Sequence, residues 1–185
     1  INVDIKEINS KTGKVFLKSG ELDMALGAYA EGETESYTAY SEPYYTDAVV
    51  FYARKGGIAD AAEIVGRKVG VVASSYAGYK GRLEEFLKKK GVACEMVEFS
   101  SYPDAAEALR LGLIDAFAGD SALLQTYAQG CVRLPGYVLP HGFRIALRKD
   151  NPELKKAVNE FLLQMRKDGT FTLLLQKWQL SDYAG

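Results

Sequence analysis

An internal repeat is the feature that most constrains the fold of this chain. The segments LKSGELD at 17–23 and LRLGLID at 109–115 place leucine, glycine and aspartate at the same offsets, and a second glycine follows each aspartate after four residues. In each copy a helix can end at the first glycine, which tolerates a left-handed cap, and a short apolar strand can run to the second. The repeat therefore predicts two related α/β units.

The segments around the second copy favour parallel strands covered by helices. Apolar strands are expected at 69–73 and 114–118, alternating with amphipathic helices around 81–90 and 103–111. Two further β-rich segments, 48–55 and 142–149, each end in an Arg-Lys pair. We expect them to cross between two lobes that do not share a single continuous sheet.

Crossing strands at these places predict a first lobe that is discontinuous in sequence. Its first part is expected at 1–50, the second lobe with its flanking hinge strands at 51–145, and the return to the first lobe at 146–185. Proline at position 152 suits the start of a helix, and the Asp168-Gly169 pair separates this helix from another. The apolar residues expected to pack in a core here are Leu162, Leu163, Phe171, Leu174 and Trp178.

The composition excludes several classes of protein. With 185 residues, 48% of them hydrophobic, the chain can bury a substantial core. Its 23 basic and 24 acidic residues give a net charge of −1, which provides no overall basic field for nucleic acid. His141 is the single histidine, and Cys94 and Cys131 lack the spacing of a zinc site, so no metal or cofactor is predicted. Two buried thiols are favoured over a disulfide.

Several motifs occur in an order that resembles the family 3 extracellular solute-binding proteins, which serve ABC importers of polar amino acids and also occur as sensor domains. Besides the repeat, they are SEPYY at 41–45, GRKVGV at 66–71 and MRKDGT at 165–170. The resemblance covers nearly the whole chain. It implies a two-lobed α/β fold of the type II periplasmic-binding-protein kind, with two crossing hinge strands. Similar chains begin with a further strand and helix, so the N-terminal unit of lobe 1 is expected to be missing.

In open α/β sheets, ligands bind beyond the carboxyl ends of the strands. This rule and the resemblance select the same loops. The resemblance implies that Asp120 receives the ammonium group of a ligand and that Ser75 and Tyr76 meet a carboxylate. The full set of candidate ligand-binding residues is Gly27, Tyr29, Thr34, Ser75, Tyr76 and Asp120. An ordinary alternative for Asp120 is the N-cap of a helix, because Ser121-Ala-Leu-Leu follows it directly.

Position 34 departs from the family pattern. Family members that bind α-amino acids generally place an arginine seven residues after the glycine at position 27, where it holds the α-carboxylate by two parallel hydrogen bonds. This chain has Thr34. Threonine offers one neutral donor, and a desolvated carboxylate would lose its principal partner. We therefore expect a ligand that lacks a free α-carboxylate or that binds it through other groups.

The predicted function is an extracytoplasmic solute-binding protein that captures a small polar, amino-acid-like or amine-containing ligand between its lobes and delivers it to an ABC-transporter permease. The expected location is periplasmic or extracellular, the expected state is a monomer, and no residue is assigned a catalytic role. One alternative is the ligand-sensing domain of a receptor. Another is a dehydratase-like enzyme, in which Asp120 could serve as an acid, although the sequence shows no acid partner for His141.

Overall fold

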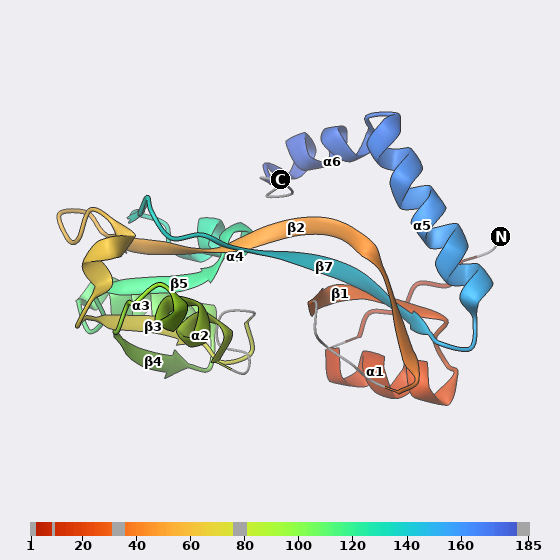
Figure 1. The fold of residues 1–185 in the computed structure, drawn as a ribbon, viewed down its shortest axis with the longest axis horizontal. Helices are drawn as coiled ribbons and strands as arrows, with labels where there is room; N and C mark the ends of the chain where they lie inside the picture. The colour runs from red at the N-terminus through yellow and green to blue at the C-terminus, as the bar shows by residue number, and fades with distance from the viewer. Residues whose placement is uncertain (1–2, 9, 31–35, 76–80, 181–185) are drawn as a thin grey trace. The chain divides into compact units, whose positions relative to one another are not determined.

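The computed structural model describes residues 3–8, 10–30, 36–75 and 81–180. Helices and strands alternate through these segments, and Figure 1 labels most of them. In chain order they are α1 (Ser10–Ser19), β1 (Met24–Ala30), β2 (Thr38–Arg54), the 3₁₀ helix η1 (Ala61–Ile64), β3 (Lys68–Val72), α2 (Arg82–Lys89), β4 (Glu95–Phe99), α3 (Tyr102–Leu111), β5 (Ala116–Asp120), α4 (Ser121–Tyr127), β6 (Cys131–Arg133), β7 (Leu139–Arg148), α5 (Pro152–Lys167) and α6 (Thr170–Trp178).

The chain divides into two compact units. Unit 1 contains the described residues of 1–46 and 142–180, and unit 2 contains those of 47–141. Strand pairing follows one path, β1-β7-β2-β5-β3-β4, with β6 beside β2. The expectation of no continuous sheet is therefore wrong, because β2 and β7 are long enough to belong to both units. The lobe limits expected at 1–50, 51–145 and 146–185 stay a prediction.

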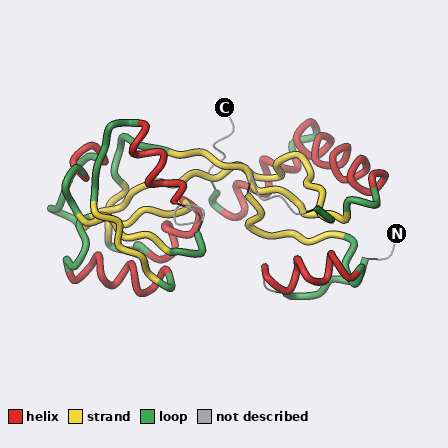
Figure 2. Tube along the Cα trace, turned by 60° about the horizontal axis from the view of Figure 1, so that its bottom comes forward, coloured by secondary structure: helices red, strands yellow, loops and turns green. Residues whose placement is uncertain are grey.

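Unit 2 is a sheet covered on both faces. Strand β3 pairs in parallel with β4 and β5, and β5 pairs antiparallel with β2. Successive side chains of a strand point to opposite faces, so Val49 and Phe51 of β2 join one core cluster while Ala48 and Val50 join the other. Helix α2 covers the first face with Leu83 and Leu87, and α3 and α4 cover the second. Figure 2 shows helices on either side of these strands.

Both copies of the sequence repeat end their helix at a left-handed glycine. Gly20 follows α1 with φ of +84°, and Gly112 follows α3 with φ of +75°. The arginine that ends a long strand lies against each glycine. A Cβ added to Gly20 would lie 2.7 Å from Arg148 of β7, and one added to Gly112 would lie 3.1 Å from Arg54 of β2. The left-handed backbone favours glycine at both positions, and the absence of a side chain leaves room for the flexible arginine beside it.

Unit 1 has a smaller described core. Strand β1 pairs antiparallel with β7, and Leu17 of α1 packs with Ala25 and Ala146 of these strands. The buried Ser41 links β2 to β7, because its Oγ accepts a hydrogen bond from the Ile145 backbone N–H at 2.9 Å. These contacts hold α1 against the paired strands of the unit.

The two C-terminal helices differ from the expectation of a packed core. Neither α5 nor α6 contains a buried residue among those described. Leu163, Leu174 and Trp178 are exposed, and Leu162 and Phe171 are only half-buried. Helix α5 is attached through polar contacts, such as the hydrogen bond that the Glu42 backbone N–H donates to Asn159 at 2.8 Å. The prediction of core packing is therefore wrong for the three exposed residues, since no described element covers that face.

The loop between α3 and β5 offers a matched test of the core in unit 2. Ile114 is 2% exposed and its neighbour Leu113 is 64% exposed. We expect Ile114→Ala to lower the free energy of unfolding by about 2 to 5 kcal/mol, because it removes buried methyl groups and leaves a cavity. Leu113→Ala should change it by less than about 0.5 kcal/mol. Chemical denaturation followed by circular dichroism measures both, and equal losses would contradict the described burial.

Candidate ligand-binding site

A buried polar cluster lies at the carboxyl end of β5 in unit 2. Asp120 is the last residue of that strand and is 4% exposed. Its Oδ2 accepts a hydrogen bond of 3.0 Å from the hydroxyl of Tyr102, and its Oδ1 lies 3.2 Å from Nε2 of His141. Three segments distant in sequence, the starts of α3 and β7 and the end of β5, therefore meet at one carboxylate.

The second carboxylate of the cluster, Asp47, caps helix α4. Its Oδ1 accepts from the Ala48 backbone N–H at 2.7 Å, and its Oδ2 accepts from the Ala122 N–H at 3.3 Å. Asp120 occupies the N-cap position of α4, but its side chain makes no capping hydrogen bond. Asp120 is therefore the N-cap residue by position, as the alternative predicted, but its carboxylate does not cap the helix. Asp47 satisfies a helix N–H that Asp120 would otherwise accept, which leaves the Asp120 carboxylate to Tyr102 and His141.

Burial raises the pKa of the Asp47 carboxyl above its ordinary value, and the charge of Asp120 adds to the rise. The hydrogen bonds from Ala48 and Ala122, and the proximity of His141, act in the opposite direction and do not cancel it. The folded protein therefore holds this proton more tightly than the unfolded chain does. The contribution of Asp47 to stability must fall as the pH rises above the ordinary aspartate pKa.

Tyr102 is fixed by its ring and by its hydroxyl. The ring packs against Phe117 of β5 and Tyr127 of α4, with centroids 5.7 and 5.6 Å away. A Cβ on Gly119 would lie 3.1 Å from this ring, so the second glycine of the repeat allows the close approach. Burial, followed by the charge of Asp120, raises the pKa of the Tyr102 hydroxyl well above its usual range. The hydroxyl therefore stays protonated and remains a donor to Asp120.

Ser75 is the other predicted ligand residue that the structure places in this cluster. It is buried, and its Oγ donates to the Val72 carbonyl at 2.7 Å in the turn that follows β3. Its side chain also interacts with the Tyr102 hydroxyl. The structure thus brings Ser75 and Asp120 together through Tyr102, a residue that the sequence did not single out.

The remaining predicted residues lie elsewhere or outside the described segments. Gly27 belongs to unit 1, and its carbonyl accepts a hydrogen bond from the Tyr44 hydroxyl at 3.1 Å. Tyr29 also belongs to unit 1, where its backbone pairs with Arg144 in β7. Thr34 and Tyr76 lie outside the described residues. Their roles in ligand binding stay predictions.

Sequence reasoning missed Asp47, Tyr102 and His141 as members of the cluster. His141 was expected to have no acid partner, and the structure corrects this by placing it beside Asp120. The available signals were weak: Asp47 is a charged residue directly before an apolar strand, and His141 is the single histidine of the chain. Neither pattern indicates which distant residues Asp47 and His141 contact, because those contacts depend on how the strands pair.

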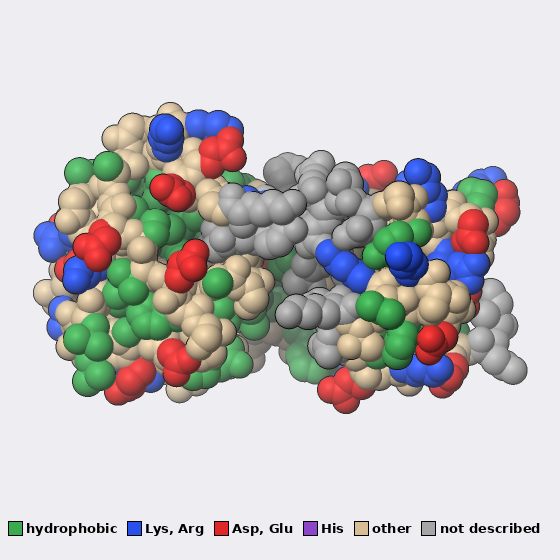
Figure 3. All heavy atoms as spheres, turned by 90° about the horizontal axis from the view of Figure 1, so that it is seen from below, with side chains coloured by type: hydrophobic (Ala, Val, Ile, Leu, Met, Phe, Trp, Pro, Cys, Tyr) green, Lys and Arg blue, Asp and Glu red, His purple; other side chains and the backbone are tan. Residues whose placement is uncertain are grey.

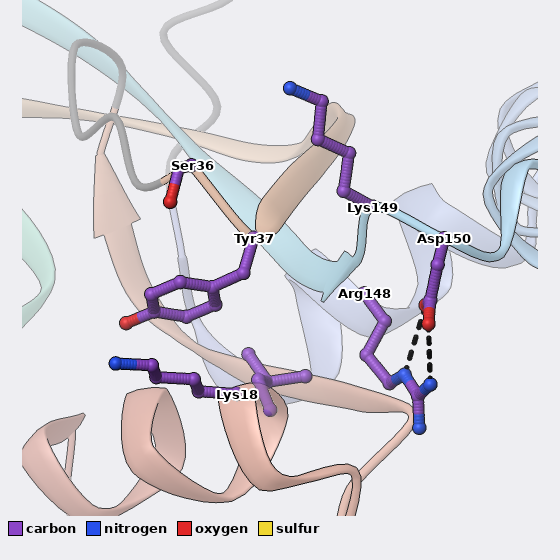
Figure 4. A pocket seen from close by; sticks show the side chains of 7 residues that line it. Lys18, Ser36, Tyr37, Arg148, Lys149 and Asp150 are labelled. Carbon is purple, nitrogen blue, oxygen red and sulfur yellow. Dashed lines mark hydrogen bonds and ion pairs between the residues drawn. The ribbon is translucent and has the colours of Figure 1, made fainter.

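A separate cavity of about 350 Å³ lies wholly in unit 1. Figure 4 shows Lys18, Arg148 and Lys149 on its walls, together with Ser36, Tyr37 and Asp150. Arg148 donates to both carboxylate oxygens of Asp150, at 3.0 and 2.6 Å. With three cations and one anion, this cavity does not suit an ammonium group. None of the described candidate ligand residues lines it.

Charged side chains of both signs lie on the surface, and the two cysteines lie in unit 2. Acidic and basic side chains are interspersed on the face of each unit that Figure 3 shows. Among the described residues, no group of three or more His, Cys, Asp or Glu could hold a metal ion, and no helix is long and apolar enough to span a membrane. Cys94 and Cys131 are free thiols that are half-buried, not fully buried as expected. They pack against opposite faces of the unit 2 sheet.

Removing the Asp47 side chain should destabilise the end of β5. We expect Asp47→Ala to lower the free energy of unfolding by about 1 to 3 kcal/mol, because two backbone N–H groups lose their acceptor. Asp47→Asn keeps one acceptor oxygen and should lose less. Denaturant titration of both variants at pH 7 makes the comparison. If Asp47→Ala were as stable as the natural protein, Asp47 would not be the cap of α4.

Curated relatives cover most of this chain. It is 32% identical over 170 residues to the L-cystine-binding protein TcyJ of Escherichia coli K12, which covers 88% of this chain and 62% of the relative. It is 27% identical to the putative ABC transporter arginine-binding protein 2 of the same organism, over 79% of this chain and 61% of the relative. The glutamine-binding protein GlnH of Bacillus subtilis is 27% identical, over 97% and 66%. The chain thus spans just under two thirds of the length of these relatives.

Solved structures show the same fold. An ancestral arginine-binding protein bound to arginine superposes with a TM-score of 0.70 at 26% identity, over 96% of this chain and 80% of the other. The ancestral amino acid-binding protein AncCDT-1, a precursor of cyclohexadienyl dehydratase, gives a TM-score of 0.69 at 26% identity, over 89% and 71%. The fold is therefore that of the type II periplasmic binding proteins, as predicted. Since the family model for bacterial extracellular solute-binding proteins, family 3, matches residues 1–181, the chain belongs to that family.

Proposed function

We propose that this chain belongs to a solute-binding protein that captures a small amine-bearing, amino-acid-like molecule for an ABC-transporter permease, and that Asp120 holds the cationic group of that molecule. The family and the names of its curated relatives support the transport role. The location that follows from the family is periplasmic or extracellular. We place the protein among binding proteins and not among enzymes, as a monomer in solution.

The main support for the proposal is that the Asp120 carboxylate makes no capping hydrogen bond to helix α4. Asp47 accepts the hydrogen bond from the α4 backbone, so the Asp120 side chain serves other partners. It lies at the carboxyl end of a strand in an α/β sheet, which is where such sheets bind ligands. The cluster contains two carboxylates, and a carboxylate in a buried setting favours a cationic partner.

The absence of arginine at position 34 narrows the ligand class. Thr34 cannot supply the two parallel hydrogen bonds by which a guanidinium holds a carboxylate. The Ser75 hydroxyl already donates to the Val72 carbonyl, so it can offer a ligand carboxylate only an uncharged contact. The proposed ligand therefore either lacks a free α-carboxylate or binds it through groups other than Thr34.

Replacing Asp120 tests the proposed cation site. In the full-length protein, we expect Asp120→Asn to weaken the binding of agmatine and L-arginine by about 10- to 150-fold, because a charge-assisted contact of about 1.5 to 3 kcal/mol is lost. Isothermal titration calorimetry measures the affinity. The exposed Asp4→Asn makes the same change in net charge and should leave binding unaltered. Unchanged affinity in Asp120→Asn would remove Asp120 from the site.

Position 34 provides an independent test of the ligand class. Agmatine is arginine without its carboxylate, and we expect the full-length protein to bind it at least as tightly as L-arginine. Thr34→Arg should strengthen L-arginine binding selectively, and Thr34→Lys should do so less, because an ammonium lacks the planar fork of guanidinium. Calorimetry with both ligands on the natural protein and on the Thr34→Arg, Thr34→Lys and Thr34→Ala variants decides it. A strong preference of the natural protein for L-arginine, lost in Thr34→Ala, would contradict the proposal.

A further inference from the structure

The two carboxylates of the buried cluster differ in how their oxygens are used. Both oxygens of Asp47 accept hydrogen bonds from backbone N–H groups, and Oδ2 of Asp120 accepts one from the Tyr102 hydroxyl. The fourth oxygen, Oδ1 of Asp120, lies 3.2 Å from Nε2 of His141 but accepts no hydrogen bond from any residue that the structure describes. A buried acceptor without a donor is unfavourable, which makes Oδ1 the position for a further donor.

Tyr102 keeps Oδ2 of Asp120 engaged through a hydrogen bond of 3.0 Å. Its ring lies against Phe117 and Tyr127, with centroids 5.7 and 5.6 Å away, and a Cβ on Gly119 would lie 3.1 Å from it. The ring therefore cannot turn aside without losing these contacts. Burial raises the pKa of the Tyr102 hydroxyl above its usual range, so the hydroxyl keeps the proton that it donates.

The number of open oxygens decides which cation a carboxylate holds best. A guanidinium presents two parallel N–H groups and pairs with both oxygens of a carboxylate at once. An ammonium is a compact charge, and a single oxygen gives it a charge-assisted hydrogen bond. Oδ1 of Asp120 alone therefore suits an ammonium group, whereas the second N–H of a guanidinium would meet an oxygen that Tyr102 already occupies.

We propose that Tyr102 is a specificity-determining residue of this site: it holds Oδ2 of Asp120, so the ligand meets the carboxylate through Oδ1 alone and the site prefers a primary ammonium group to a guanidinium group. The inference rests on the proposed function, because it assumes that Asp120 receives the ligand cation. It adds the residue that selects among cations. Tyr102 acts through Asp120 and needs no contact with the ligand.

Three probes with the same four-carbon chain test the preference in the natural protein. Putrescine carries two ammonium groups, agmatine carries one ammonium and one guanidinium, and arcaine carries two guanidinium groups, so all three are dications at neutral pH. We expect the full-length protein to bind putrescine and agmatine at least about tenfold more tightly than arcaine, because arcaine can offer only a poorly matched guanidinium. Isothermal titration calorimetry measures the affinities. Equal or tighter binding of arcaine would overturn the inference.

Tyr102→Phe tests the residue itself. This variant keeps the ring and removes the hydroxyl, so both oxygens of Asp120 become open to a ligand. We expect the preference for putrescine over arcaine to fall by about fivefold or more, because a guanidinium can then pair with both oxygens. Tyr127→Phe is the matched control, since it removes the hydroxyl of the neighbouring stacked ring and should leave the preference unchanged. An equal loss of affinity for all three probes in Tyr102→Phe would show a structural role only and would overturn the inference.

A second test needs no ligand. The melting temperatures of Tyr102→Phe, Asp120→Ala and the double variant form a cycle that measures the coupling between the two residues. We expect non-additive losses, because each single variant breaks the same hydrogen bond, and additive losses when Tyr127→Phe replaces Tyr102→Phe in the cycle. Additive losses for the Tyr102 pair would show that its hydroxyl does not hold Asp120. If Tyr102→Phe is unfolded, the order of the three probes on the natural protein decides the inference.

The outcomes separate this inference from the proposed function. If Asp120→Asn weakens the binding of the probes but Tyr102→Phe leaves their order and ratios unchanged, the inference is wrong and the cation site stands. If neither the probes nor L-arginine bind to the full-length protein, or if Asp120→Asn leaves their affinities unchanged, the proposed function is wrong and the inference falls with it. A preference for ammonium that depends on Asp120 and on the Tyr102 hydroxyl supports both proposals.

Discussion

The two hydrogen bonds that Asp47 accepts determine which carboxylate of the cluster caps helix α4. Asp47 lies on β2 and accepts from the backbone N–H groups of its neighbour Ala48 and of Ala122 in α4. Helix α4 therefore begins without a hydrogen bond to the side chain at its own N-cap position. This arrangement keeps a carboxylate buried at a raised pKa, which is unfavourable for stability at neutral pH. It leaves Asp120 to Tyr102 and His141, and the proposed site depends on that freedom.

The repeated glycines connect the fold to this cluster. The first glycine of each copy takes the left-handed conformation and lies against the arginine that ends a long strand. The second glycine meets a tyrosine in each unit: the Tyr44 hydroxyl donates to the Gly27 carbonyl, and the Tyr102 ring lies against Gly119. Close backbone approach at the second glycine of the later copy is what lets Tyr102 reach the carboxylate at the end of β5.

The two units differ in how they are stabilised. Unit 2 buries apolar side chains on both faces of its sheet, in two clusters. The described core of unit 1 is built on Leu17, Ala25 and Ala146, and its helices α5 and α6 bury no residue among those described. Hydrophobic burial therefore stabilises unit 2 more than the described part of unit 1. Polar contacts, such as the Glu42–Asn159 hydrogen bond, attach α5 instead.

The sequence by itself determined the positions of several helices and strands, and it singled out Asp120 as the candidate ligand-binding carboxylate. Glycine caps, apolar alternation and the repeated pattern depend on neighbouring residues, so the helix ends at Gly20 and Gly112 and the strand leading to Asp120 could be predicted. Only the tertiary structure decided which carboxylate caps α4 and which residues surround Asp120. The distance from Asp47 to Ala122 is 75 positions in the chain, and no local pattern encodes such a contact. It follows from the antiparallel pairing of β2 with β5, which sets Val49 opposite Asp120 and so brings Asp47 to the start of α4.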